Sequence, residues 1–125
     1  MIWAAVAIGG AIGSAARHGV NHVVAVWTGR PNPYATFTVN MIGSFVIGLL
    51  AGLIAAQRLD LTPAARTFLF VGILGGFTTF SSFMLDTLTL TSGGQVVAAV
   101  ANAGGQVVLG YLLAYVGYRL GVPSL

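Results

Sequence analysis

The chain has 125 residues, room for one domain at most, and its composition decides which kind of domain it is. Charged residues make up 6% of it, against about 25% in ordinary soluble domains, and apolar residues make up 57%. The charged set is five Arg and two Asp, and Lys, Glu and Cys do not occur. This composition excludes a soluble surface, a disulfide framework, Cys-based metal or redox chemistry and a basic run for nucleic acid. The expected solvent is a lipid bilayer.

Four long stretches with almost no charge predict four membrane helices. A bilayer core of about 30 Å needs about 20 helical residues. We expect spans near residues 2–27, 34–57, 65–91 and 94–120, which make residues 1–125 a single four-helix transmembrane domain. Barrel strands are not expected, because they alternate polar and apolar residues and these stretches do not. The connections are too short for a soluble catalytic site, so we expect the function to lie within the membrane.

The 18 Gly residues favour close packing of these helices. Several are spaced as small residues four apart, such as Gly9/Gly13 and Gly48/Gly52, and Gly105 is followed five residues later by Gly110. Small residues let helix backbones approach each other closely in lipid. We interpret these patterns as helix contacts.

The Arg residues are nearly balanced between the two faces of the membrane. One face would hold Arg58, Arg66 and Arg119 together with Asp60, and the other would hold Arg30. The positive-inside rule therefore gives almost no preferred orientation. Such a chain can insert both ways, and an antiparallel dimer is then a natural assembly. The alternative, that one orientation dominates, stays open.

Side chains from all four spans share one layer of the membrane. At 1.5 Å per residue they lie about 9 to 20 Å from the face that bears the first and third loops. They are Arg17, Asn40, Phe80, Phe83, Asn102 and Gln106. Because polar residues in membrane spans are costly and commonly functional, this layer predicts a polar pathway. Asn102 and Gln106, taken alone, are better explained as side chains that hydrogen-bond between helices.

The third span contains Gly75-Gly-Phe-Thr-Thr-Phe-Ser-Ser-Phe83 close to its middle. Adjacent glycines and hydroxyl side chains both weaken a helix, so we expect a break at the membrane midplane. A break exposes carbonyl groups, which are tolerated there only when they are buried or bind an ion. The Phe residues recur every third position, and the electropositive edge of a Phe ring can face an anion.

These features resemble the Fluc/CrcB family of fluoride channels over nearly the whole chain. The resemblance rests on Gly9-Gly-Ala-Ile-Gly-Ser-Ala-Ala-Arg17, on Thr36-Phe-Thr-Val-Asn-Met-Ile-Gly-Ser-Phe45 and above all on Gly75 to Phe83. It implies an all-α membrane protein of the bacterial plasma (inner) membrane, with the third helix broken at mid-membrane and two subunits in an antiparallel, dual-topology homodimer. The implied function is a fluoride-selective channel, not an enzyme, that exports fluoride passively and lowers cytoplasmic fluoride.

The resemblance also implies roles for particular residues. A structural sodium ion at the dimer interface would be held by the main-chain carbonyls of Gly75 and Thr78. The predicted ion pathway consists of a Phe pair, amide donors, hydroxyls after the break and the Arg of the first span: Phe80, Phe83, Asn40, Asn102, Gln106, Thr79, Ser81, Ser82 and Arg17. Two features depart from the family. Asp86 stands where it often has Glu, and the amides of the fourth span stand where relatives commonly have Tyr, Ser or His.

The residues also suit the chemistry of fluoride directly. Fluoride is small and strongly hydrated and only accepts hydrogen bonds, so a pore must replace its water with donors. Asn40 and the hydroxyls can supply donors, and Phe80 and Phe83 offer electropositive edges in a narrow passage. The sequence has no P-loop and no carboxylate pair for proton exchange, so passive conduction is the simplest interpretation.

Other classes of function stay open as alternatives. A small dual-topology proton-coupled drug exporter needs a membrane-embedded acid, normally a Glu in the first span, and here the one acid in a span is Asp86. A structural subunit would need neither the Gly-Gly break nor the converging donors. His18 and His22 are four residues apart and could form a metal patch, but no carboxylate matches them, so we expect an interfacial role.

Overall fold

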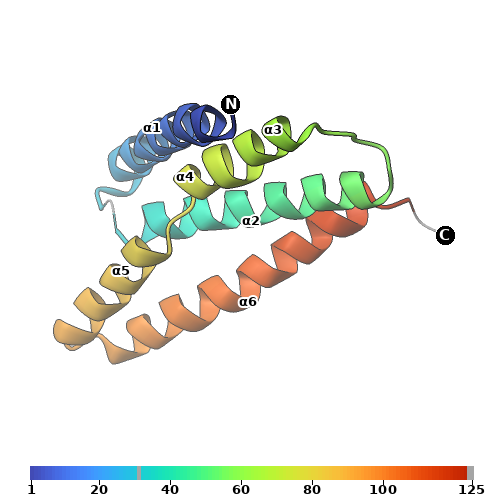
Figure 1. Cartoon of the computed structure of the whole chain (residues 1–125). Helices are drawn as coiled ribbons and strands as arrows, with labels where there is room; N and C mark the ends of the chain where they lie inside the picture. The colour runs from blue at the N-terminus through green and yellow to red at the C-terminus, as the bar shows by residue number, and fades with distance from the viewer. Residues whose placement is uncertain (31, 124–125) are drawn as a thin grey trace.

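The computed structural model describes residues 1–30 and 32–123. Over these residues the chain forms helices in the order α1 Ile2–Thr28, α2 Tyr34–Ala55, α3 Pro63–Arg66, η1 Thr67–Leu74, α4 Gly75–Phe77, α5 Phe80–Ser92 and α6 Val96–Gly121 (Figure 1). The predicted all-helical class is confirmed, and the described part of the chain contains no strand. The helices α3, η1 and α4 follow one another without a gap, with η1 wound as a π-helix.

Three helical segments of the described chain are long and apolar enough to cross a membrane: Tyr34–Ala55, Pro63–Ser92 and Val96–Gly121. They have 22, 30 and 26 residues, and a bilayer needs about 20. The protein is therefore a multi-pass membrane protein. Helix α1 is equally long, with 27 residues, but its second half carries Arg17, His18, Asn21 and His22. That α1 also spans the membrane stays a prediction.

The third predicted span is interrupted at Thr78 and Thr79. Helix α4 ends at Phe77, both threonines have extended backbone angles, and α5 begins at Phe80. The side chain of Thr79 caps α5, because its Oγ1 accepts a hydrogen bond of 3.1 Å from the N–H of Ser82. Helix α5 leaves the interruption in a new direction and runs toward the first turns of α6 (Figure 1).

Glycine faces bring the helix backbones together in two places. Helices α2 and α6 lie side by side (Figure 1), and a Cβ atom on Gly48 or Gly117 would collide with a backbone carbonyl of the facing helix. Helix α1 packs against η1 and α4 in the same way, since a Cβ on Gly13 would collide with the Ile73 carbonyl. These contacts are typical of membrane helix pairs. A Cβ on Gly105 meets no heavy atom within 4 Å among the described residues, so the contact expected there stays a prediction.

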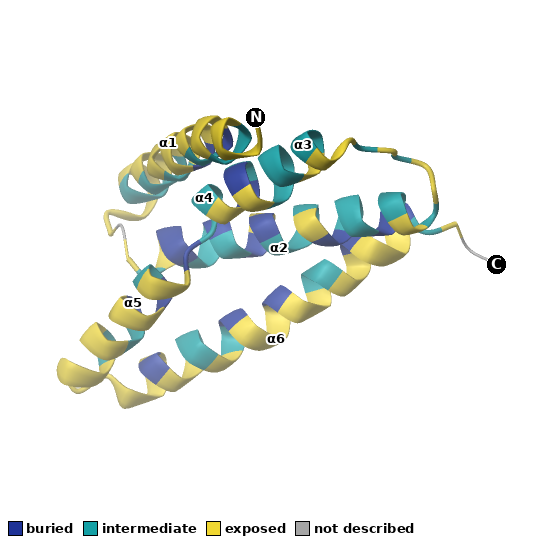
Figure 2. Ribbon diagram, in the orientation of Figure 1, coloured by how far each residue is buried: buried dark blue, intermediate teal, exposed yellow. Residues whose placement is uncertain are grey.

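Few residues are buried (Figure 2), and many of the exposed ones are large and apolar. Ala35 and Val39 of α2 are fully covered, and Phe83 of α5 is 5% exposed. Large apolar side chains stand exposed along α1 and α6, for example Trp3 and Val97. Continuous apolar surface of this kind requires lipid or another protein chain as its neighbour.

Candidate ion pathway

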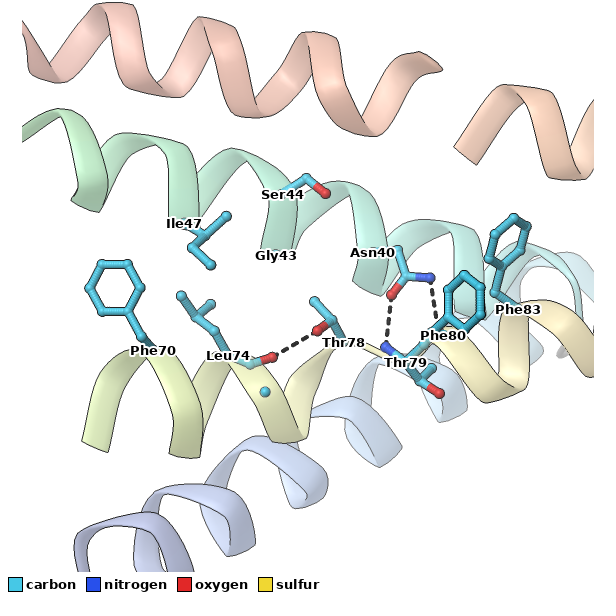
Figure 3. Close-up of a pocket in the computed structure, with 11 residues that line it drawn as sticks. Asn40, Gly43, Ser44, Ile47, Phe70, Leu74, Thr78, Thr79, Phe80 and Phe83 are labelled. Atoms are coloured by element: carbon cyan, nitrogen blue, oxygen red, sulfur yellow. Dashed lines mark hydrogen bonds between the residues drawn. The ribbon is translucent and has the colours of Figure 1, made fainter. Parts of the chain in front are cut away.

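Asn40 of α2 is the centre of a polar cluster at the interruption. Its Oδ1 accepts a hydrogen bond of 2.9 Å from the main-chain N–H of Thr79, and its Nδ2 donates one of 3.1 Å to the Thr79 carbonyl (Figure 3). The same Nδ2 donates a hydrogen bond of 2.7 Å to Oε1 of Gln106, a buried residue of α6. Helices α2 and α6 thus hold the main chain where it is not helical.

The cluster continues along α6 to α5. Nε2 of Gln106 donates to Oδ1 of Asn102 at 3.2 Å, and Nδ2 of Asn102 donates to Oγ1 of Thr87 at 3.0 Å. The Thr87 hydroxyl in turn donates to the carbonyl of Phe83 at 2.9 Å. Sequence reasoning missed Thr87, although its position four residues after Phe83 places the two on one face of α5.

A cavity of about 310 Å³ adjoins Asn40 (Figure 3). It brings together six of the predicted residues: Asn40, Gly75, Thr78, Thr79, Phe80 and Phe83. The rings of Phe80 and Phe83 meet edge to face, with their centroids 5.7 Å apart and their planes at 80°. Phe83 is buried, whereas Phe80 is 72% exposed at the edge of the cavity. The Phe pair therefore stands where donors and main-chain carbonyls converge.

A second cavity, of about 410 Å³, contains the remaining predicted hydroxyls and the predicted Arg. Ser81, Ser82 and Arg17 all line it, and Thr79 lines both cavities. Oγ of Ser81 lies 3.4 Å from Oγ1 of Thr79. Arg17 is thus grouped with the hydroxyls of α5 and not with the amide cluster on α2 and α6. Its guanidinium gives this second cavity a fixed positive charge.

Asp86 lies outside the predicted pathway. It is a buried residue of α5 and lines neither of the two cavities. Its Oδ2 has no hydrogen-bond partner among the residues described, and the Thr36 side chain lies beside the carboxyl group. The structure therefore separates this acid from the residues that gather at the interruption.

The interruption frees a main-chain carbonyl that a continuous helix would use. In an α-helix the N–H of Thr79 would donate to the carbonyl of Gly75, but here it donates to Asn40. In membrane transporters, the main-chain carbonyls of unwound helix segments commonly coordinate Na⁺. The described residues contain no group of three His, Cys, Asp or Glu that could hold a metal instead. Gly75 and Thr78 both line the cavity, and main-chain carbonyls are oxygen ligands of the kind that fits a monovalent cation.

Comparison with known proteins finds a family and a consistent set of relatives. Residues 4–118 match the family described as "CrcB-like protein, Camphor Resistance (CrcB)". A fluoride-specific ion channel FluC of Thermus thermophilus is 48% identical over 116 residues, which are 93% of this chain and 91% of that protein. The protein of the same name from Magnetococcus marinus is 45% identical over 93% of this chain and 94% of its own. That from Nitrobacter winogradskyi is 50% identical over 84% and 82%.

Proposed function

The chain belongs to the CrcB-like family, and we propose that it is a fluoride channel that conducts the ion passively out of the cell across the bacterial plasma membrane. The observation that carries the function is the extent of the match. A fluoride-specific channel is 48% identical over 93% of the chain, and the family match at residues 4–118 includes every residue of the interruption and of both cavities. The membership confirms the resemblance seen in the sequence, and it makes the protein a channel rather than an enzyme.

The proposed ion path uses the groups that the two cavities collect. In the first cavity the ion meets the ring edges of Phe80 and Phe83, which carry partial positive charge and cannot accept a hydrogen bond. Thr79 lines both cavities, so the proposed path passes from one to the other beside this residue. Arg17 in the second cavity attracts the anion before it loses its water. A path lined by hydroxyl donors, ring edges and one guanidinium favours a small, strongly hydrated anion.

An antiparallel homodimer of four-span subunits is part of the proposal. Phe80 is 72% exposed in the single chain, so a second chain is needed to close a pore around its ring on that side. The near balance of Arg between the faces supports insertion in both orientations. Cysteine labelling of the loops in intact cells is expected to find each loop on both sides of the membrane. A single labelled orientation would contradict the antiparallel arrangement.

A structural sodium ion between the subunits belongs to the same proposal. The carbonyls of Gly75 and Thr78 would hold it, and the ion would supply the positive charge that unpaired carbonyls require in lipid. We expect the dimer to be recovered in lower yield from detergent when sodium is replaced by a bulky organic cation. Unchanged yield and melting behaviour without sodium would remove the ion from the proposal.

Efflux from liposomes tests the function itself. Purified protein in liposomes loaded with fluoride is expected to release the ion, as a fluoride electrode detects, once valinomycin lets potassium move with it. Liposomes loaded with chloride should retain their contents. A proton-coupled exporter would instead require an imposed pH gradient and would release an organic cation. Absence of fluoride release from folded protein would refute the proposed function.

A further inference from the structure

A chain of side-chain hydrogen bonds leaves the third span at Thr79 and returns to it at Phe83. Every bond in it points the same way, from the N–H of Thr79 through three carboxamides and one hydroxyl to the carbonyl of Phe83. The side chains, in order, are Asn40, Gln106, Asn102 and Thr87. This series of hydrogen bonds therefore connects both ends of the segment that contains Phe80 and Phe83 to α2 and α6.

The main chain of Thr79 imposes this direction. A main-chain N–H can only donate and a carbonyl can only accept, so Asn40 must turn Oδ1 to the first and Nδ2 to the second. In that orientation the second hydrogen of Nδ2 points at Gln106, which must accept it with its side-chain oxygen. Nε2 of Gln106 then faces Asn102, which must also present its oxygen. The orientation of each amide follows from the one before it.

Both N–H groups of Asn40 are occupied in this arrangement. One donates to the Thr79 carbonyl and the other to Gln106, so the amide supports the non-helical main chain and has no hydrogen left over for an anion. Without the oxygen of Gln106, one N–H of Asn40 would lose its partner in a part-buried site, and the carboxamide would be held against the main chain of Thr79 less firmly.

We propose that Gln106 is a positioning residue of the channel, which acts on the ion path through Asn40 instead of contacting the ion. It accepts the second N–H of Asn40 and so stabilises the carboxamide that pairs with both main-chain groups of Thr79, which helps to set where α5 begins and where Phe80 and Phe83 stand. The proposal rests on the proposed function for the identity of the ion. The positioning itself is a property of the fold and can be measured without fluoride.

Residue-resolved hydrogen exchange on the full-length protein tests the positioning. Gln106→Met keeps the length of the side chain but removes both hydrogen-bonding groups. The Thr79 amide is expected to exchange about tenfold faster, because its partner Asn40 has lost the hydrogen bond to Gln106. Gln106→Glu retains an oxygen for Asn40 but loses the bond to Asn102, so exchange should rise only about threefold, and the control Gln57→Met in the exposed turn after α2 should leave it slow. Unchanged exchange in Gln106→Met, or exchange in Gln106→Glu as fast as in Gln106→Met, would overturn the proposal.

A double-mutant cycle on fluoride flux separates positioning from direct contact. Gln106→Met alone is expected to slow flux about tenfold. Added to Asn40→Ala it should change flux by less than about twofold, because the residue through which it acts is already gone. A further loss of about tenfold in the double variant would mean that Gln106 contacts the ion, and would overturn the proposal. If the unmodified protein passes no fluoride, the proposed function fails while the exchange result stands.

If Gln106→Met yields no folded protein, the hydrogen-exchange test can be made on Asn102→Leu instead. It removes the acceptor of Gln106 Nε2 and so frees Gln106 to rotate, one step further from Asn40. We expect exchange at Thr79 to rise about threefold, less than on direct removal of the Gln106 oxygen. Exchange as slow as in the unmodified protein would overturn the proposed chain of orientation.

Discussion

The two halves of the third span are held in place by different kinds of contact. Before the interruption, η1 and α4 meet α1 backbone to backbone, and a Cβ on Gly72 would lie only 2.9 Å from the Cα of Gly9. After it, α5 is held to α2 and α6 by hydrogen bonds, among them the bond from Asn102 to Thr87. The first half should therefore be sensitive to added volume, and the second to the loss of a donor or an acceptor.

This difference suggests that one half of the third span supports the fold and the other half interacts with the ion. Backbone contacts between glycines offer no group that distinguishes one ion from another, so the half packed on α1 supplies a rigid base. The half after the interruption presents hydroxyls and ring edges, and its arrangement depends on hydrogen bonds to amides of α2 and α6 that can be removed one at a time. Substitutions on the two sides should accordingly fail in different ways, by unfolding on one side and by loss of conduction on the other.

The largest effect is expected for Phe80→Ile and Phe83→Ile. Ile is of similar hydrophobicity but has no electropositive ring edge, so fluoride efflux should fall to near that of protein-free liposomes while the protein still folds. Met is expected to restore part of the flux, because its thioether is polarizable and fits irregular gaps. Full flux through either folded Ile variant would show that the rings only pack, and would withdraw the pore assignment.

Asn40→Ala is expected to come next, with flux reduced about thirtyfold, or roughly 2 kcal/mol. The substitution leaves the N–H and carbonyl of Thr79 and the oxygen of Gln106 without their partner. Gel filtration in detergent should still find folded protein, since the packed glycine contacts are untouched. Flux equal to that of the unmodified protein would mean that the Thr79 main chain needs no support from α2.

Gly13→Ala tests the other half and should act on stability instead of conduction. The new Cβ collides with the Ile73 carbonyl, and we expect a loss of about 1–3 kcal/mol, seen as a lower midpoint of thermal aggregation in detergent. Gly19→Ala on the same helix is the matched control, because a Cβ there meets no heavy atom within 4 Å. Equal stability of the two variants would remove the distinction between the halves of the span.

Thr79→Val gives the smallest expected effect. It removes the hydroxyl that caps α5 at Ser82 but keeps both main-chain hydrogen bonds to Asn40. Loss of a cap costs about 1 kcal/mol, so the melting midpoint should fall by a few degrees. Thr79→Ser retains the hydroxyl and should melt like the unmodified protein. A Val variant as impaired in flux as Asn40→Ala would show that the side chain of Thr79, and not its main chain, is what matters.

Much of the fold was predictable because the bilayer limits the choices. Apolar runs with charges at their ends indicated helices whose bounds lie within two residues of those observed. Pro63, expected at the start of the third span, is the first residue of α3. The Gly75-Gly76 pair with the threonines indicated a weak point, and the extended residues follow it directly. Helix length and helix weakness are local properties, so one segment of sequence contains the information.

The partners of the site residues were less accessible to sequence reasoning. Depth along a helix placed Arg17 in the same membrane layer as Asn40. Depth says nothing about direction around the helix axis, and the structure puts the two in different cavities. The amide of Asn40 was expected to be a free donor, and it is fully bonded because Gln106, 66 residues further along the chain, meets it. Such pairs depend on how the helices rotate against each other, which no single segment determines.

The glycine contacts between α2 and α6 have a consequence for how the protein is made. Helix α6 follows α2 and the third span in the chain, so both enter the membrane before their partner has been synthesised. Until α6 arrives, Gly48 faces no backbone and Asn40 lacks the oxygen of Gln106, so nothing yet holds the non-helical segment in its final shape. Insertion of separate helices is followed by their association in lipid. The middle of the chain therefore reaches its conducting form only after its last helix has left the ribosome.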